Sequence, residues 1–198
     1  MTDCLIVGVG GQGTILASRL IGSAALGLGL DVRGSETIGM AQRGGSVMSH
    51  VRMGDGIHSP LISLGSADVI LAFEPCEGAR AVPYLRPDGL MIVCDRAIQP
   101  AGFFNASGES GYDLRAVIEY LRSSVERLCI LDGEKINERC GARSLNVAIL
   151  GAALFFGELP CSMEEMEGVI GERFDTYYAE MNKKALEFGA SLACECGK

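Results

Sequence analysis

The sequence lacks the cysteine spacing of a metal or iron–sulfur centre. It contains eight cysteines, but no two of them form a C-x-x-C pair, which is the usual spacing in zinc sites and clusters. Cys4, Cys94 and Cys129 lie in apolar runs, where a thiol is normally a small buried side chain. Cys194 and Cys196 form the only close pair, at a terminus expected to fray, with a metal or redox role as the alternative. We expect no metal site, and free thiols fit a reducing cytoplasm.

Basic charge and long apolar runs are also missing. The net charge of −8 argues against a nucleic-acid-binding protein. No uncharged run approaches the roughly 20 apolar residues of a membrane span. The apolar start is interrupted by Asp3 and glycines and has no basic region, so we expect no signal peptide. These features predict a cytoplasmic protein with neither nucleic acid nor membrane as a partner.

The signatures of several enzyme classes are absent as well. There is no G-x-S-x-G nucleophile elbow and no Walker lysine. Gly54-Asp55-Gly56 begins like a thiamine-diphosphate metal motif, but the asparagine that should follow is absent, so a hairpin turn explains it better. His50 and His58 are expected to face each other across that hairpin, in a structural or interfacial role. We therefore predict no catalytic residue in this chain.

What is present is an alternation of apolar strands and helices through the first two thirds of the chain. The apolar runs 4–9, 68–73, 90–94 and 128–131 read as buried strands. Helices are expected over 14–28, 74–85 and from a cap at Asp113, and a helical segment follows from about residue 144. The pattern predicts one domain over 1–198, a three-layer α/β/α Rossmann-like fold with a mixed, mostly parallel sheet.

Weaker signals complete the expected elements. Residues 31–38 form a second strand, and 46–53 a strand that turns back at Gly54–Gly56 into a hairpin with 57–62. A turn is expected at 87–89. In the helical segment, 144–156 carries no charge, Ser162 and Glu165 form a capping box, and a last helix runs over 176–193. The uncharged helices 14–28 and 144–156 are expected to be buried, with partner contact as the second choice.

The first glycine loop follows the first strand directly. Gly8, Gly10 and Gly13 satisfy G-x-G-x-x-G, and Thr14 opens the helix behind them. Glycines allow close approach of a pyrophosphate, and the free N–H groups of the first helical turn attract it. The predicted site therefore contains Gly8, Gly10, Gly11, Gln12, Gly13 and Thr14. A tight strand–helix turn without ligand is the alternative. Glu36 lies 23 residues after Gly13, near the position of a ribose-binding acid.

A second glycine loop precedes the strand at 46–53. It contains Gln42, Arg43, Gly44, Gly45 and Ser46. An arginine between glycines has little packing role, and its guanidinium suits a phosphate or carboxylate. Residues 1–50 carry no net charge, so an anion meets least repulsion there. We predict that this loop lies at the ligand or at a subunit interface. A simple dinucleotide-binding fold has no such loop, which argues against an NAD dehydrogenase.

The motifs taken together are more specific than any one of them. GVGGQG at 8–13, SETIGMAQRGGSVMSHVRMG at 35–54, SPLI at 59–62 and ADVILAFEP at 67–75 follow one another in order. This set resembles the gamma-type subunit or domain of 2-oxoacid:ferredoxin oxidoreductases. It is most similar to the beta subunit of the indolepyruvate enzymes. Asn146 and GERF at 171–174 fit the same resemblance.

The resemblance implies a complex. Such enzymes oxidatively decarboxylate a 2-oxoacid on thiamine diphosphate, pass electrons through iron–sulfur clusters to ferredoxin, and form an acyl-CoA. It implies that those cofactors lie on a catalytic partner subunit and that none is tightly bound here. This chain would pack against that partner and help to hold coenzyme A at residues 10–13. A homo-oligomer of the isolated chain stays open. The other hypotheses are a stand-alone NAD- or flavin-binding oxidoreductase using Glu36, and a binding module without chemistry.

Overall fold

The computed structural model describes residues 1–38, 45–98, 111–141 and 143–196. Its strands are β1 (Thr2–Val9), β2 (Val32–Ile38), β3 (Ser46–Met53), β4 (Ala67–Ala72), β5 (Leu85–Cys94) and β6 (Arg127–Leu131). Its helices are α1 (Thr14–Gly27), α2 (Pro75–Ala81), α3 (Leu114–Ser124), α4 (Gly133–Cys140), α5 (Leu145–Phe155), α6 (Met163–Arg173) and α7 (Thr176–Cys196). A short 3-10 helix, η1 (Val82–Tyr84), follows α2. Among these described helices, none has the length and apolar character needed to cross a membrane.

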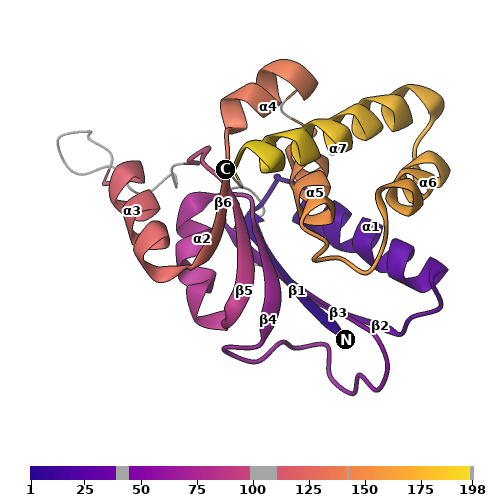
Figure 1. The fold of residues 1–198 in the computed structure, drawn as a ribbon, viewed down its shortest axis with the longest axis horizontal. Coiled ribbons are helices and arrows are strands. Elements are labelled where there is room, and N and C mark those ends of the chain that lie inside the picture. The colour runs from indigo at the N-terminus through magenta and orange to yellow at the C-terminus, as the bar shows by residue number, and fades with distance from the viewer. Residues whose placement is uncertain (39–44, 99–110, 142, 197–198) are drawn as a thin grey trace.

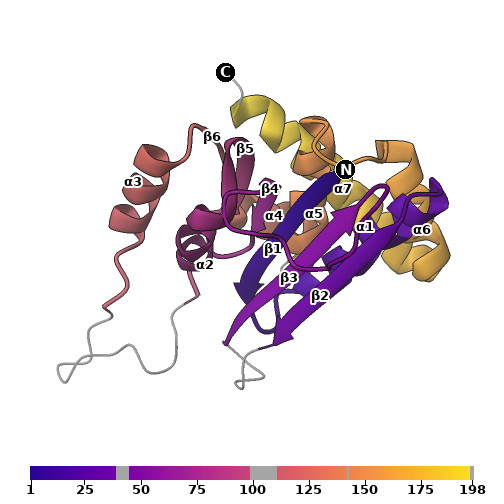
Figure 2. The ribbon, with the colours of Figure 1, turned by 90° about the horizontal axis from the view of Figure 1, so that it is seen from below.

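One sheet runs through the molecule in the order β2-β3-β1-β4-β5-β6. Helices α2 and α3 cover one face, and α1, α5 and α7 cover the other (Figures 1 and 2). Successive residues of β1 serve different cores: Ile6 packs with α1 and α5, whereas Leu5 packs with α2 and α3. Coverage of both faces explains why the central strands are continuous apolar runs instead of alternating ones. The predicted three-layer α/β/α fold is confirmed.

The sheet is mixed, as predicted, but the expected hairpin is wrong. Residues 57–62 contain no strand. Strand β3 instead runs antiparallel to both β1 and β2, with Ser46 opposite Val9 and Met53 opposite Thr2. Val51 and Met53 are buried on the α1 side and His50 on the opposite side. Strand β3 therefore lies inside the sheet, between β1 and β2, and both of its faces are buried.

The loop after β3 packs back onto the strand through polar contacts. The Ile62 N–H donates to Nδ1 of buried His50 at 3.1 Å. Arg52 donates to the carbonyl of Ser59 at 3.1 Å. His58 lies in this loop and is exposed, so the two histidines are not paired across a hairpin. His50 has the structural role that was expected.

The C-terminal helices form the thicker layer. Every residue of α5 from Leu145 to Ala153 is buried, which confirms the burial expected from its lack of charge. The contact with α7 leaves no room for side chains at Gly151 and Gly189, whose Cβ atoms would each meet a backbone oxygen at 1.8 Å. The two helices therefore pack backbone to backbone at that crossing.

Several element boundaries differ from the sequence expectation. The predicted caps at Asp113 and Ser162 are present. Helix α4 was not expected; its N-cap is Asp132, whose carboxylate accepts from the N–H groups of Glu134 and Lys135. The turn expected at 87–89 is an irregularity inside β5. Helix α7 continues to Cys196, so the expectation of a frayed end at Cys194–Cys196 is wrong.

Candidate functional site at the carboxyl edge of the sheet

The candidate site lies where the chain changes faces of the sheet. The neighbouring parallel strands β1 and β4 lead into α1 and α2, which cover opposite faces (Figure 1). In open α/β sheets, ligands bind at the carboxyl ends of strands at such a switch point. Here the first glycine loop follows β1 and the acidic first turn of α2 follows β4. The fold thus brings two sequence features that are separated by some sixty positions in the chain to one edge of the sheet.

The side chain of Gln12 fills the inside of the first loop. Its Oε1 accepts from the Val9 N–H at 2.8 Å, and its Nε2 donates to the carbonyl of Phe73 at 2.7 Å. A Cβ atom on Gly8 would lie 2.7 Å from that Oε1. A side chain at position 8 would therefore displace the Gln12 amide, and Gln12 connects the loop to the end of β4.

Only some backbone N–H groups of this loop donate hydrogen bonds within the described residues. The Gly10 N–H donates to the carbonyl of Gly45 at 2.8 Å, and the Gln12 N–H to that of Val9 at 3.2 Å. The first of these bonds joins the two glycine loops. Within the described residues, the N–H groups of Gly11 and Gly13 have no acceptor. Both glycines have a positive φ, of 102° and 84°.

Helix α1 begins at this loop without a side-chain cap, and Gly13 occupies the N-cap position. An uncapped N-terminus presents free N–H groups and the positive end of the helix dipole. Thr14 is buried. Gly11 is exposed, and a Cβ atom on it would meet nothing within 4 Å. The open side of the loop is therefore the side of Gly11, and an anion could approach it there.

Asn146 at the start of α5 supports the loop from behind. Its Nδ2 donates to the carbonyl of Gly13 at 3.4 Å. A Cβ atom on Gly13 would lie 2.5 Å from that nitrogen. Asn146 is only 3% exposed, so it is part of the loop's support and does not face solvent.

The other predicted site residues lie in different places. Glu36 is on β2, with β3 between it and β1, and its carboxylate accepts from Ser18 Oγ at 3.2 Å. A ribose-binding acid belongs at the end of the strand next to β1, and the insertion of β3 separates Glu36 from that position. Gln42, Arg43 and Gly44 lie outside the described residues. Gly45 and Ser46 lead into β3 beside the first loop.

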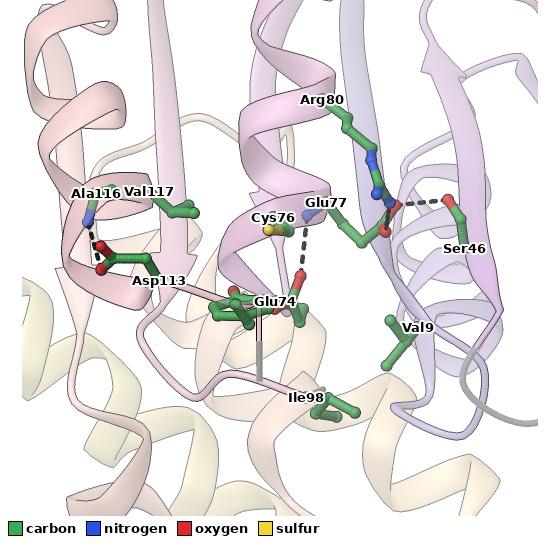
Figure 3. Close-up of a pocket in the computed structure, with 12 residues that line it drawn as sticks. Val9, Ser46, Glu74, Cys76, Glu77, Arg80, Ile98, Asp113, Ala116 and Val117 are labelled. Carbon is green, nitrogen blue, oxygen red and sulfur yellow. Dashed lines mark hydrogen bonds and ion pairs between the residues drawn. The ribbon is translucent and has the colours of Figure 1, made fainter. Parts of the chain in front are cut away.

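A cavity of about 410 Å³ opens at the same edge. Figure 3 shows Val9 and Ser46 on one side, the first turns of α2 in the middle and the start of α3 on the other side. Its lining residues are Val9, Ser46, Glu74, Cys76, Glu77, Arg80, Ile98, Gly111, Tyr112, Asp113, Ala116 and Val117. The cavity combines apolar walls with buried carboxylates, as ligand sites commonly do.

The two buried carboxylates hold this cavity together. Glu77 accepts from Ser46 Oγ at 2.5 Å and pairs with Arg80 (Figure 3). Glu74 caps α2, accepting from the Glu77 N–H at 3.0 Å, and also accepts from the Tyr112 hydroxyl. The first turn of α2 therefore positions both the start of β3 and the segment before α3.

Two titratable groups of the cavity, Tyr112 and Cys76, have raised pKa values. Burial, together with the hydrogen bond to Glu74, raises the pKa of Tyr112 well above its usual range. Burial also raises the pKa of the Cys76 thiol, partly offset by a hydrogen bond with Tyr112. A thiol with a raised pKa is a poor nucleophile. These groups suit binding and positioning more than covalent catalysis.

Comparison with known proteins identifies the family. The sequence matches the family model described as pyruvate ferredoxin/flavodoxin oxidoreductase over residues 3–192. The chain belongs to this family. The resemblance drawn from the motifs is therefore confirmed, and as a gamma-type member of the pyruvate ferredoxin/flavodoxin oxidoreductase family the chain is a subunit of an oxidoreductase complex.

Relatives within the family cover nearly the whole chain. An indolepyruvate oxidoreductase subunit, IorB, of Archaeoglobus fulgidus is 38% identical, over 96% of this chain and 94% of the relative. The crystal structure of pyruvate oxidoreductase subunit PORC from Thermotoga maritima shares the fold with a TM-score of 0.69 and 23% identity, covering 96% and 95% of the two chains. A 2-oxoglutarate:ferredoxin oxidoreductase from Magnetococcus marinus, solved with 2-oxoglutarate, coenzyme A and succinyl-CoA, gives a TM-score of 0.70 at 20% identity, covering 98% of this chain and 31% of that one.

Some residues of the site were not found from the sequence. Glu77 and Tyr112 had no signal in the sequence, because their partners Ser46 and Glu74 lie more than thirty positions away. Glu74 was visible only as the residue before Pro75 at a helix start. Asn146 was noted through the family motif but without a role. In the described part of this family member, no group of three or more His, Cys, Asp or Glu side chains is arranged to hold a metal ion.

Proposed function

We propose that this chain is the subunit without thiamine diphosphate in a complex that oxidatively decarboxylates an aryl-pyruvate, such as indolepyruvate, to an acyl-CoA. The observation that carries this choice is the 38% identity with an indolepyruvate oxidoreductase subunit over nearly the full length. Identity with the pyruvate and 2-oxoglutarate enzymes is lower, at 23% and 20%. The chain acts as one domain in the cytoplasm.

The cofactors and the electron acceptor are part of the same proposal. Thiamine diphosphate and iron–sulfur clusters lie on the catalytic partner, and ferredoxin takes the electrons. The turn Gly54–Gly56 does not fit a thiamine metal site at the cavity. It follows Met53, which pairs with Thr2 at the start of β1. The turn therefore lies at the opposite end of the strands from the glycine loop, which follows the last residue of β1.

The glycine loop assists in binding coenzyme A. Its support is the uncapped start of α1 with the free N–H groups of Gly11 and Gly13, which suits the pyrophosphate of that ligand. Thr14 supplies a further backbone N–H. Gly8, Gly10 and Gln12 shape the loop, and the second loop, Gln42–Ser46, faces the ligand or the partner subunit. The same fold forms part of the 2-oxoglutarate:ferredoxin oxidoreductase chain that was solved with coenzyme A bound.

Reconstitution tests the assembly and the substrate. The chain should copurify with a cluster-bearing, thiamine-binding subunit. The pair should reduce ferredoxin and form acyl-CoA with indolepyruvate or phenylpyruvate, at a higher kcat/KM than with pyruvate or 2-oxoglutarate. Neither subunit alone should do so. Turnover by this chain alone, or preference for pyruvate, would overturn the proposal. Light scattering on the isolated chain reports whether it forms a homo-oligomer.

A matched pair of variants tests the coenzyme A site. Gly11→Asp places a carboxylate at the open side of the loop, where it competes with the pyrophosphate. Gly29→Asp is the control, because Gly29 also has a positive φ, of 76°, and open space around it. The reconstituted Gly11 variant should show a KM for coenzyme A raised about tenfold or more, corresponding to ~1.4 kcal/mol. Equal KM values for the two variants would exclude this site while leaving the subunit assignment intact.

A further inference from the structure

The last turn of α7 packs against β6, the strand at one edge of the sheet. Figure 1 shows the end of this helix beside β6. At this contact, Cys196 Sγ lies 3.1 Å from the carbonyl oxygen of Ile130. The hydrogen bond covers a backbone acceptor that no neighbouring strand could pair with. It also places the Cys196 side chain against β6, one position along the strand from the residue that precedes Ile130.

That preceding residue is Cys129. Cys129 is 1% exposed and belongs to the core on the α7 side of the sheet, and the neighbouring Cys196 thiol contributes to its raised pKa. Both cysteines are free, and Cys196 is exposed. Two neighbouring thiols, one buried and one accessible, are separated by 67 positions in sequence and are brought together only by the fold. We propose that Cys129 and Cys196 are a redox-sensitive pair that forms a disulfide and locks the end of α7 onto β6.

The surroundings of Cys196 admit a small oxidant. Cys196 lines a cavity of about 390 Å³ together with Arg122, Glu126, Leu128 and Ile130. One half of a low-molecular-weight disulfide such as oxidised glutathione can enter a space of this size. The Arg122 guanidinium lies in the same cavity and is suited to pair with a carboxylate of that molecule. The exposed thiol, and not the buried one, is therefore the first to react.

The chemistry proceeds by two exchange steps. The Cys196 thiolate attacks one sulfur of the small disulfide, forming a mixed disulfide and releasing one small thiolate. The Cys129 thiolate then attacks the Cys196 sulfur, which forms the protein disulfide and releases the second small thiolate. The two protein thiol protons pass to the released thiolates through solvent. Two protein thiols are oxidised, and one small disulfide is reduced to two thiols.

The second step sets the rate. Burial and the contact with Cys196 raise the pKa of Cys129 far above its usual range, so the fraction of thiolate is small. The packing of α7 on β6 offsets this, because it keeps the two thiols near each other. The product closes a loop that contains α4, α5, α6 and α7. Such a cross-link constrains the unfolded chain and raises stability.

The test uses the reduced full-length chain, with Cys194→Ser and Cys196→Ser as a matched pair of exposed variants. Each protein is incubated with oxidised glutathione, alkylated under denaturing conditions and mapped by tandem mass spectrometry. The unmodified chain and Cys194→Ser should both yield a Cys129–Cys196 cross-linked peptide, and their Tm should rise by about 5–15 °C over the reduced form. Cys196→Ser should yield neither.

Three results would overturn the proposal. The first is a Cys194–Cys196 or Cys129–Cys194 cross-link in the unmodified chain. The second is a mixed disulfide on Cys196 that persists while Cys129 stays open to alkylation. The third is a cross-link to Cys129 that survives in Cys196→Ser. None of these readouts depends on the activity of the complex, so they are independent of the proposed function.

Discussion

A Cβ atom placed on Gly151 would lie 1.8 Å from the carbonyl oxygen of Leu186. Helices α5 and α7 therefore cross at a distance that only glycine permits. Gly189 has the reciprocal relation to the Ala148 carbonyl, also at 1.8 Å. Since α5 is buried along almost its whole length, this crossing holds the C-terminal helices against the sheet.

The first prediction follows from this crossing. Gly151→Ala should lower the free energy of unfolding by about 3 kcal/mol or more, because backbone atoms, not flexible side chains, must move. Gly168→Ala in α6 is the control, since a Cβ atom there meets nothing within 4 Å. The control should raise stability by up to about 1 kcal/mol through helix propensity. Urea denaturation measures both, and equal effects of the two variants would contradict the crossing.

The second prediction concerns the Gln12 side chain. Gln12→Ala removes an acceptor from the Val9 N–H and a donor from the Phe73 carbonyl. Leaving two part-buried backbone groups unpaired should cost about 1–3 kcal/mol. Gln12→Glu keeps the shape but replaces the donor with an oxygen facing the Phe73 carbonyl.

Denaturation of the two Gln12 variants distinguishes a structural role of this side chain from a role in ligand contact alone. Both variants should be less stable than the unmodified chain. If Gln12 contacted only a ligand, as its position in the motif first suggested, neither variant would lose stability in the absence of ligand. That outcome would reverse the structural role assigned to Gln12.

The third prediction is a pH dependence from His50. Burial lowers the pKa of His50, and its Nδ1 accepts from the Ile62 N–H, so the folded state favours the neutral ring. Below roughly pH 6.5, the pKa of a histidine in the unfolded chain, His50 takes up a proton in the unfolded chain but stays neutral in the folded chain. Stability from this group is therefore present above that pH and is lost as the pH falls towards the lowered folded pKa.

His50→Asn removes the titrating group while an amide oxygen can still accept from Ile62. The variant should lose less stability between pH 7 and pH 5 than the unmodified chain, as judged by denaturation midpoints. His58→Asn is the matched control, because His58 is exposed in the same region. It should follow the pH profile of the unmodified chain. Identical profiles for all three proteins would contradict the role of His50.

The fourth prediction concerns Ser49 in the middle of β3. Its hydroxyl is fully buried and, among the described residues, has no hydrogen-bond partner. Removing a buried unpaired hydroxyl relieves its desolvation cost, so Ser49→Ala should be neutral or stabilising by about 1 kcal/mol. Thermal unfolding measures the change. A loss of more than ~1 kcal/mol would mean that the hydroxyl has a polar partner in the folded protein.

The local features of the site were largely predictable from the sequence. Gly8, Gly10 and Gly13 indicated a tight turn between a strand and a helix, and the structure contains this turn between β1 and α1. The caps at Asp113 and Ser162 were also found. Each of these features depends on residues that are neighbours in sequence or on backbone conformations that only glycine adopts.

The largest error concerns strand pairing over distance. The strand 46–53 was paired with the segment that follows it, whereas its partners are β1 and β2. This insertion moved Glu36 away from the strand next to the glycine loop. Likewise, Gln12 was assigned to a ligand because its partner Phe73 is 61 positions away. Alternation along a strand shows which faces are buried, but it does not identify the neighbouring strands.

The sequence by itself determined the family, the layered α/β fold, the glycine loops and the burial of the uncharged helices, because these follow from motif order, apolar periodicity and backbone freedom. Only the tertiary structure decided what those groups do. In the folded chain the Gln12 side chain lies inside the loop. Glu77 is hydrogen-bonded to Ser46 and Glu74 to Tyr112, and Cys196 lies against the strand that contains Cys129. Side-chain hydrogen bonds form between groups that the packing of helices on a sheet brings within about 3 Å, and that packing is a property of the whole chain.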